Sequence, residues 1–409
     1  MRAKNFDLYV KKKISSFKKV IKVDSDKSLS IRSFLIGSIS NNISVVNNVL
    51  ESEDVKSTIK VCRQLGVKIV KIKSLSYKIY GRGLGSLFPK KSRILNFGNS
   101  GTLARLLIGI LSTTPNIKVK VKGDRSLNKR DMKKLINLTS EFGASFLPVN
   151  KNKFPLTMIS SKMPVGIKYK AGVSAQLKSA AILAGLNSFG NTVIEEKIIS
   201  RDHTENLLKQ NVNVIKIKKN KKKLIYVVGK KYLKPFKLDI GGDPSSAAFF
   251  SALTLLNKKS SIIIKNINLN PTRIGFYEIL KQQKASIKFF NLKKNNNEVK
   301  GDIVVKSCKL KPLKTPANFY SKTTDEYLIL FVIAALTKGV SSFKGISDLS
   351  NKESSRAYEM KKILNQIGIK CKLSKNEMKI YGNGMIDASS KKINVGNLGD
   401  HRVAMCAFI

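Results

Sequence analysis

An internal repeat constrains the fold of this chain more than any other feature of its sequence. Six times along the 409 residues, a short polar turn containing Gly or Asp leads directly into an apolar segment of helical length. A chain with such a repeat folds as several copies of one small unit. The repeats begin, at intervals of 74, 75, 70, 81 and 75 residues, at Asp24, Gly98, Val173, Asp243, Thr324 and Gly399.

Strands and amphipathic helices are predicted between the apolar helices. Runs rich in β-branched residues predict strands at 117–122, 262–267 and 303–305, and the spacing of apolar residues predicts helices at 132–142 and 277–283. Each unit is therefore mixed α/β. Because a chain of 409 residues is too long for one ordinary domain, six units fit two domains of three units each.

The start of each repeat has the chemistry of an anion site. A helix N-terminus presents unpaired N–H groups and the positive end of the helix dipole. A capped, buried helix explains any single start without a function, but several starts also carry a cation within the first turns. If these starts converge on one cleft, they would bind a ligand with more than one phosphate or carboxylate group. The cations are Lys27, Arg32, Arg105, Lys178 and Arg402.

The charge balance alone would suggest a nucleic-acid or membrane-surface protein, since 77 Lys and Arg against 26 Asp and Glu give +51. The lysines are spread along the whole chain, however, and no basic helix with interleaved aromatic residues is present. We interpret most of them as solvated surface lysines and expect no specific nucleic-acid partner. The longest apolar run, 327–336, is too short to span a bilayer, so no membrane partner is expected either.

Metal and disulfide chemistry is not expected. The four cysteines lie far apart without a CxxC pair, and His203 and His401 are the only histidines, so neither a zinc site nor a histidine-rich metal site is indicated. Residues 1–23 have no continuous apolar segment or cleavage site of a secretory signal. This segment is basic and mildly amphipathic, as transit peptides are, but Asp7 and the alternation of Val20, Ile21 and Val23 suit a first strand better than a transit peptide. We therefore expect a cytoplasmic location.

Ten motifs, in order along nearly the whole chain, resemble the bacterial EPSP synthases (3-phosphoshikimate 1-carboxyvinyltransferases) of the enolpyruvyl transferase family. The matching segments are Asp26–Arg32, Gly98–Thr102, Gly123–Arg130, Ser174–Ser179, Ser200–Glu205, Gly242–Ala248, Pro271–Arg273, Asp325–Glu326, Lys352–Arg356 and Gly399–Arg402.

The resemblance implies a two-domain inverse α/β barrel-like fold of six repeated βαβαββ units, three in each domain. The N-terminal, shikimate-phosphate-binding domain would comprise residues 24–238. The C-terminal domain would comprise residues 1–23 and 239–409, with two crossings between the domains, in a monomeric protein. The apolar run 403–409 has no stop signal, so we expect the sixth unit to be incomplete by about thirty residues.

The reaction implied is transfer of the enolpyruvyl group of phosphoenolpyruvate to the 5-hydroxyl of shikimate 3-phosphate, with release of phosphate, in the shikimate pathway to chorismate and aromatic amino acids. It needs no metal or organic cofactor. The resemblance assigns catalytic roles to Lys27, Asp325 and Glu353, with Asp325 and Glu353 as the acid–base pair and Lys27 reaching the reacting centre. It assigns shikimate 3-phosphate contacts to Lys27, Ser28, Arg32, Ser174, Ala175, Gln176, Ser200, Asp325 and Lys352. It assigns phosphoenolpyruvate contacts, at the site where glyphosate would compete, to Lys27, Gly101, Arg130, Gln176, Arg356 and Arg402.

Three residues around Lys352 and Glu353 depart from the family pattern, and we expect them to affect the stiffness of that loop: Ser350, Asn351 and Ser355. Two alternative functions stay open. One is the enolpyruvyl transferase acting on UDP-N-acetylglucosamine, although segment 123–132 lacks that enzyme's reactive cysteine. The other is a catalytically decayed basic protein that binds anions or nucleic acid.

Overall fold

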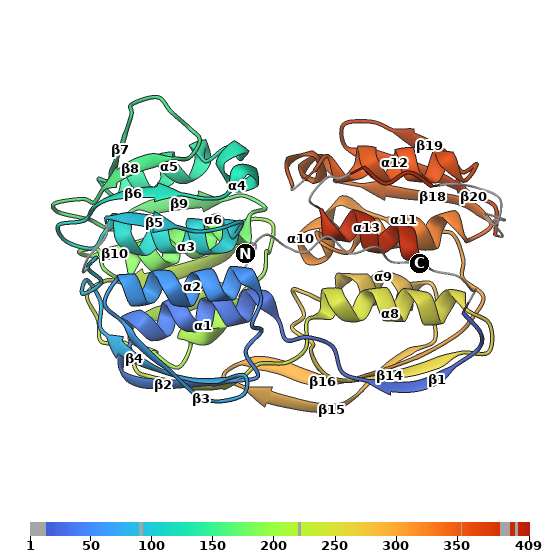
Figure 1. The fold of residues 1–409 in the computed structure, drawn as a ribbon, viewed down its shortest axis with the longest axis horizontal. Helices are drawn as coiled ribbons and strands as arrows, with labels where there is room; N and C mark the ends of the chain where they lie inside the picture. Colours follow the sequence, from blue (N-terminus) through green and yellow to red (C-terminus); the bar gives the residue numbers. More distant parts are fainter. Residues whose placement is uncertain (1–13, 90–92, 220–221, 353, 385–392, 397–399) are drawn as a thin grey trace.

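A computed structural model describes residues 14–89, 93–219, 222–352, 354–384, 393–396 and 400–409. They form two lobes side by side, each with its own hydrophobic core (Figure 1). The core of the N-terminal lobe runs from Leu29 to Ile240, and that of the C-terminal lobe runs from Ala247 to Cys406. Three residues from the start of the described chain, Phe17, Ile21 and Val23, pack against the C-terminal core.

Five four-stranded sheets of identical topology build the two lobes. In each sheet the first two strands are parallel and the remaining pairs are antiparallel. In the N-terminal lobe, one sheet has the strand order β13 (Lys237–Asp239), β2 (Asn41–Asn47), β4 (Ser76–Arg82), β3 (Lys68–Lys73). A second sheet has the order β5 (Ile94–Asn96), β6 (Lys118–Lys122), β8 (Leu156–Ile159), β7 (Ser145–Leu147). The third has the order β9 (Lys168–Ala171), β10 (Asn191–Glu196), β12 (Lys223–Val228), β11 (Ile215–Lys219). In the C-terminal lobe, one sheet has the strand order β1 (Lys18–Ile21), β14 (Ser261–Asn268), β16 (Glu298–Lys306), β15 (Ile287–Asn295). The other has the order β17 (Lys314–Thr315), β18 (Gly339–Lys344), β20 (Glu377–Gly382), β19 (Lys370–Leu373).

The predicted fold class is confirmed, and so are the strands expected at 117–122, 262–267 and 303–305. In the three sheets that begin with β5, β9 and β17, helices link the two parallel strands and a further helix leads into the hairpin, which is the βαβαββ order. The parallel pair needs this helical crossover because strands that run in the same direction cannot be joined by a tight turn.

The lobes exchange their edge strands. Strand β13 follows the third unit in sequence but pairs with β2 of the first unit, and β1 pairs with β14 in the C-terminal lobe. The chain therefore passes between the lobes twice. The two crossing segments are joined to each other, since the Asp26 N–H donates to the carbonyl of Gly241 (2.9 Å) and the Asp243 N–H donates to that of Asp24 (2.8 Å).

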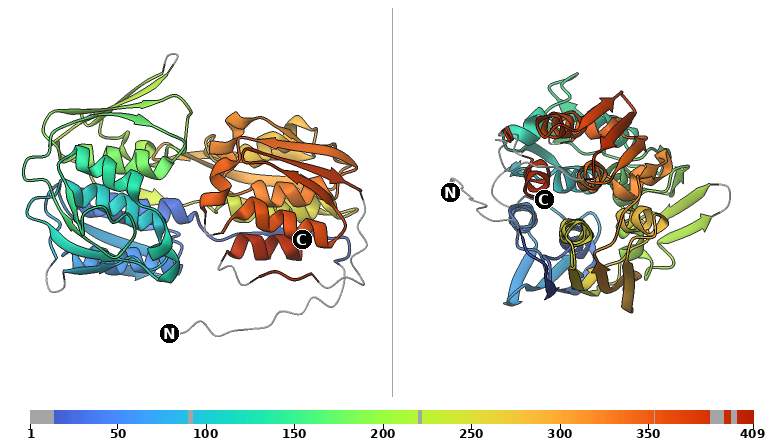
Figure 2. Two further views of the ribbon diagram at one scale, coloured as in Figure 1. Left: turned by 90° about the horizontal axis from the view of Figure 1, so that it is seen from above. Right: turned by 90° about the vertical axis from the view of Figure 1, so that its right-hand side faces the viewer.

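Helices beginning at the six repeat starts fill the lobes: α1 (Lys27–Ile39), α3 (Gly101–Ser112), α6 (Ala175–Gly185), α8 (Pro244–Leu256), α11 (Tyr327–Ala335) and α13 (His401–Phe408). Five have a side-chain N-cap, each stabilising its helix by about 1 kcal/mol. The caps are Asp26, Ser100, Ser174, Asp243 and Asp400. Because α1 and α8 start directly at the crossing segments and extend into opposite lobes, their N-termini meet at the junction (Figures 1 and 2).

Outer helices cover the sheets: α2 (Glu53–Gln64), α5 (Lys133–Glu141), α9 (Gly275–Gln282) and α12 (Arg356–Gln366). α5 and α9 confirm the helices predicted at 132–142 and 277–283 within one or two residues. The short helices α4 (Arg125–Lys129), α7 (His203–Leu208) and α10 (Tyr320–Thr323) lie in the connections. Across the described ranges, no helix is long and apolar enough to cross a membrane.

Candidate active site

The first turns of α1 carry three of the predicted site residues. Lys27 and Ser28 are partly exposed at the start of the helix. Arg32 lies one turn further in and is 3% exposed, and its guanidinium donates hydrogen bonds to the hydroxyls of Thr204 (3.0 Å) and Ser179 (3.3 Å). Burial lowers the pKa of Arg32 to about 10, so this side chain remains charged at neutral pH.

Three further predicted residues meet around Arg105. Its guanidinium donates to the Gln176 side-chain oxygen (3.0 Å) and to the carbonyl of Gly101 (3.2 Å). A Cβ placed on Gly101 would lie 2.8 Å from a guanidinium nitrogen of Arg105 and 3.0 Å from one of Arg130. The start of α3 thus holds Gly101, Arg130 and Gln176 together, with space for the guanidinium groups only because residue 101 has no side chain.

The start of α6 and the loop before α7 contribute Ser174, Ala175 and Ser200. Ser174 caps α6, and Ala175 is its first residue. Ser200 donates both its backbone N–H (2.8 Å) and its hydroxyl (2.6 Å) to the Glu196 carboxylate. Since its hydrogen is held by Glu196, the Ser200 hydroxyl has only lone pairs left and can serve other groups only as a hydrogen-bond acceptor.

Lys178 does not face a cleft, contrary to the expectation for a cation at a helix start. It is fully buried in a ring of four charges that we call the buried quartet: Lys178, Glu196, Glu205 and Lys223. Each lysine contacts both glutamates, at distances of 2.8 to 3.0 Å. Glu196 and Lys223 are direct cross-strand partners in β10 and β12, which brings these charges together inside the lobe.

Asp325, at the start of α11, lies among four arginines, and we call these five residues the arginine cluster. Arg201 of the N-terminal lobe approaches its carboxylate to 2.7 Å, while Arg356, Arg273 and Arg402 approach to 3.5, 3.6 and 3.8 Å. Burial alone would raise the pKa of Asp325, but the attraction of the four arginines holds this pKa well below its usual range. Asp325 is therefore a carboxylate surrounded by cations.

Two of these arginines stand at helix starts. Arg356 begins α12 and donates to the Asp400 carboxylate (2.8 Å), and Asp400 in turn caps α13 next to Arg402. Two predicted phosphoenolpyruvate contacts, Arg356 and Arg402, are thus held beside Asp325.

Two other predicted residues are paired elsewhere. The Lys27 ammonium lies 3.1 Å from Asp54 of α2, and the Lys352 ammonium lies 2.6 Å from Asp348. Asp348 also accepts a hydrogen bond from the Tyr320 hydroxyl (3.0 Å), so the loop carrying Lys352 is anchored despite its unusual sequence. The predicted acid–base residue Glu353 lies outside the described residues.

Arg201 and Arg273 were not assigned a role from the sequence, although both contact Asp325. Each lies inside a motif quoted above, Ser200–Glu205 and Pro271–Arg273. Their position inside these motifs was the sequence signal that could have identified the two arginines as site residues. The convergence of these two arginines on Asp325 depends on contact between segments more than fifty residues apart.

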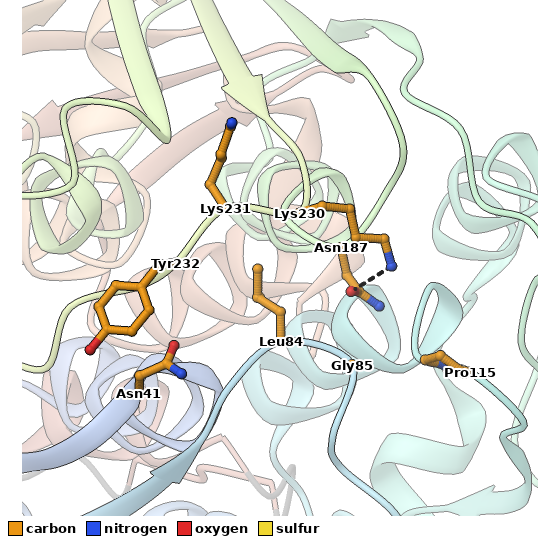
Figure 3. Close-up of a pocket in the computed structure, with 8 residues that line it drawn as sticks. All are labelled: Asn41, Leu84, Gly85, Pro115, Asn187, Lys230, Lys231 and Tyr232. Carbon is orange, nitrogen blue, oxygen red and sulfur yellow. Dashed lines mark hydrogen bonds between the residues drawn. The ribbon is translucent and has the colours of Figure 1, made fainter.

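A separate pocket of about 330 Å³ lies at the opposite ends of the N-terminal lobe helices (Figure 3). None of the predicted site residues lines it. Its lining residues, three of which follow the C-termini of α1, α3 and α6, are Asn41, Leu84, Gly85, Pro115, Asn187, Lys230, Lys231 and Tyr232. No group of three or more potential metal-ligating side chains is found within the described part of the chain.

Solved structures define the class of protein. The enolpyruvyl transferase NikO from Streptomyces tendae shares the fold at a TM-score of 0.69 with 10% identity, covering 95% of this chain and 86% of the other. The EPSP synthase from Acinetobacter baumannii matches at a TM-score of 0.80 with 33% identity, covering 96% of this chain and 88% of the other. The fold is that of the enolpyruvyl transferases.

Sequence comparison gives the family. The EPSP synthase (3-phosphoshikimate 1-carboxyvinyltransferase) family matches residues 11–409. The 3-phosphoshikimate 1-carboxyvinyltransferase of Zymomonas mobilis is 35% identical over 94% of this chain and 85% of its own length, and that of Thermodesulfovibrio yellowstonii is 38% identical over 97% and 91%. This chain belongs to the EPSP synthase family.

Proposed function

We propose that this enzyme transfers the enolpyruvyl group of phosphoenolpyruvate to the 5-hydroxyl of shikimate 3-phosphate, releasing phosphate, at the junction of the two lobes. The observation that carries this proposal is the arginine cluster, in which arginines from both lobes surround the Asp325 carboxylate. Two substrates with a phosphate and a carboxylate each need several cations at one place, and guanidinium groups bind both kinds of anion through two parallel hydrogen bonds.

The shikimate 3-phosphate subsite is assigned to the N-terminal lobe. Lys27, Ser28 and Arg32 from α1 and Ser174, Ala175 and Gln176 from α6 surround it, with Lys352 facing it from the other lobe. Ser200, as an acceptor, suits a ring hydroxyl better than a phosphate oxygen, because its own hydrogen is bound to Glu196.

The phosphoenolpyruvate subsite is assigned to both lobes. Gly101, Arg130 and Gln176 contribute from the N-terminal lobe, and Arg356 and Arg402 contribute from the C-terminal lobe. Binding of the substrate anions draws Arg356 and Arg402 away from Asp325. Since their attraction is what depresses its pKa, Asp325 becomes a stronger base at the moment when the 5-hydroxyl must lose its proton.

The chemistry then needs a proton for the methylene carbon of phosphoenolpyruvate and a base for the 5-hydroxyl. We assign the two proton transfers to Asp325 and Glu353, and we assign Lys27 to the reacting centre as a cation that contacts both substrates. Lys27 must exchange its partner Asp54 for substrate, which is a short movement for a flexible side chain that is one-third exposed.

The finer assignments follow the same proposal. We assign residues 24–238 to the N-terminal domain and residues 1–23 with 239–409 to the C-terminal domain. The protein works as a cytoplasmic monomer without metal or organic cofactor, and its partners are the two small anionic substrates.

The test is a phosphate-release assay of the purified protein with phosphoenolpyruvate and either shikimate 3-phosphate or UDP-N-acetylglucosamine. Release with shikimate 3-phosphate alone supports the proposal. Release with UDP-N-acetylglucosamine alone would identify the other enolpyruvyl transferase, and release with neither would indicate a binding protein.

A variant pair locates the activity. Lys27→Met is expected to lower turnover at least ~100-fold with the fold intact, because it removes a cation that faces two anionic substrates. The control Lys56→Met alters an exposed lysine on α2 that pairs with Glu53, and it is expected to have no effect. Equal turnover in both variants would contradict the assignment of Lys27.

A further inference from the structure

Arg273 occupies the point at which the two lobes meet. It lies in the loop between β14 and α9 and is 2% exposed, which makes it one of the largest fully buried side chains of the protein. One guanidinium nitrogen donates to the Asp243 carboxylate (2.9 Å) and the Ser245 hydroxyl (3.1 Å), and it lies 3.7 Å from Asp26. A buried arginine with these partners is fixed in position.

The carboxylates around Arg273 belong to the starts of three helices. Asp26 caps α1 of the N-terminal lobe, Asp243 caps α8 of the C-terminal lobe, and Glu326 is the N-cap residue of α11. The second terminal nitrogen lies 3.6 Å from Asp325 and 3.8 Å from Glu326. One guanidinium therefore spans from the residue before Lys27 to Asp325.

The side of Arg273 facing Asp325 has spare hydrogen-bonding capacity. Its Nε and its second terminal nitrogen are buried and have no hydrogen-bond partner in the part of the chain that the structure describes. Buried donors without a partner are costly, so an approach of the start of α11 by a few tenths of an ångström, which would give the second terminal nitrogen its hydrogen bond, is favoured.

We propose that Arg273 is a positioning residue that sets the first turn of α1 in register with Asp325 across the junction of the lobes. This inference rests on the proposed function, because it concerns the distance between two groups of that active site. It assigns Arg273 no contact with substrate. The fork geometry of the guanidinium is essential, since one nitrogen holds the crossing segments and the other faces Asp325.

The experiment compares Arg273→Met and Arg273→Lys with wild type. The control is Lys300→Met, which removes another buried cation, the partner of Asp239, but touches no site residue. Folding is checked by circular dichroism and thermal unfolding. Turnover is measured by phosphate release, and binding of shikimate 3-phosphate alone is measured by calorimetry.

For Arg273→Met we expect kcat to fall ~100-fold, the effect of a small misplacement of reacting groups, with the Kd for shikimate 3-phosphate within about twofold of wild type. The Kd should stay nearly constant because most contacts to shikimate 3-phosphate come from one lobe. Arg273→Lys keeps the buried charge, so it should fold normally, but it loses the fork and should lower kcat about tenfold. Lys300→Met should change neither quantity.

Several results would overturn the proposal: wild-type kcat in either folded variant, loss of shikimate 3-phosphate affinity in proportion to kcat, or failure of both variants to fold, which would show a structural role. Absence of phosphate release by the wild-type protein would instead refute the proposed function itself, so the two failures are distinguishable.

Discussion

The buried quartet and the arginine cluster are both groups of buried charges, but they are built differently. In the quartet two lysines and two glutamates of the N-terminal lobe form four contacts of 2.8 to 3.0 Å, and none of the four side chains is more than 3% exposed. In the arginine cluster four cations from both lobes share one carboxylate, three of the four distances are 3.5 Å or longer, and Asp325 is 19% exposed.

The difference separates a scaffold from a binding site. Balanced charges at hydrogen-bond distance leave a ligand nothing to bind. By contrast, the side chains of Arg201 and Arg402 pair with Asp325 alone among the described residues, and Arg402 does so at 3.8 Å. Loosely paired guanidinium groups beside solvent are available to an incoming anion. The quartet therefore supports the lobe, and we propose that the arginine cluster recognises substrate.

The largest expected effect comes from Asp325→Asn in the arginine cluster. Turnover should fall about 10³-fold, because the variant keeps the shape of the side chain but cannot accept a proton. The control Glu278→Gln changes a carboxylate that pairs with Lys322 on the surface, and it should keep wild-type turnover. The phosphate-release assay measures the turnover of both variants. An active Asp325→Asn protein would remove the distinction between the two clusters.

Breaking the quartet should affect stability first. Lys178→Met leaves two buried glutamates with one cation, so the free energy of unfolding should fall by about 3–5 kcal/mol. The neighbouring pair Lys222–Glu195 lies at the surface, and Lys222→Met should lower the free energy of unfolding far less than Lys178→Met does. Urea unfolding of the two variants checks this. A similar loss in both would show that burial does not distinguish these pairs.

The quartet also predicts that the free energy of unfolding decreases at acidic pH. Burial would raise the pKa of Glu205, but Lys178 and Lys223 lower it to about 2. Its contribution is therefore complete above the unfolded-state pKa and disappears as pH falls from about 4.5 toward 2, an effect of about 3 kcal/mol. The free energy of unfolding, measured from pH 7 to pH 3, should fall less steeply in Glu205→Gln, and an unchanged slope would refute this origin.

The smallest expected effect concerns Gly101. A methyl group there meets the guanidinium groups of Arg105 and Arg130, at a cost of ~1 kcal/mol, so Gly101→Ala should weaken competition by glyphosate against phosphoenolpyruvate about fivefold. Gly172→Ala is the matched control, because nothing lies within 4 Å of its added carbon. The measurement is the inhibition constant of glyphosate against phosphoenolpyruvate in wild type and in both variants. An unchanged constant in Gly101→Ala would show that this glycine does not belong to the phosphoenolpyruvate subsite.

The sequence predicted the repeated units because their signals are local. Polar caps such as Asp26 and Ser100, followed by apolar residues with helical spacing, determine where a helix starts. The same local signals could not show that Lys178 is sealed from solvent, since its partners Glu196 and Glu205 come from a strand and a second helix. Burial of a cation is a property of tertiary packing.

The candidate site was predictable only in part, for the same reason. Motifs identified Asp325, Arg356 and Arg402, which the structure brings together. Arg201 approaches Asp325 from the other lobe, and this pairing spans 124 residues of sequence. No periodicity or spacing encodes such a contact.

A crystal structure with shikimate 3-phosphate and glyphosate bound tests the central claim most directly. We predict that anionic groups of the ligands lie within hydrogen-bond distance of Arg356 and Arg402, that Asp325 loses at least one of its arginine contacts, and that the quartet keeps its distances of 2.8 to 3.0 Å. Ligands bound in the distant pocket of Figure 3, or an arginine cluster unchanged beside bound ligand, would contradict this account.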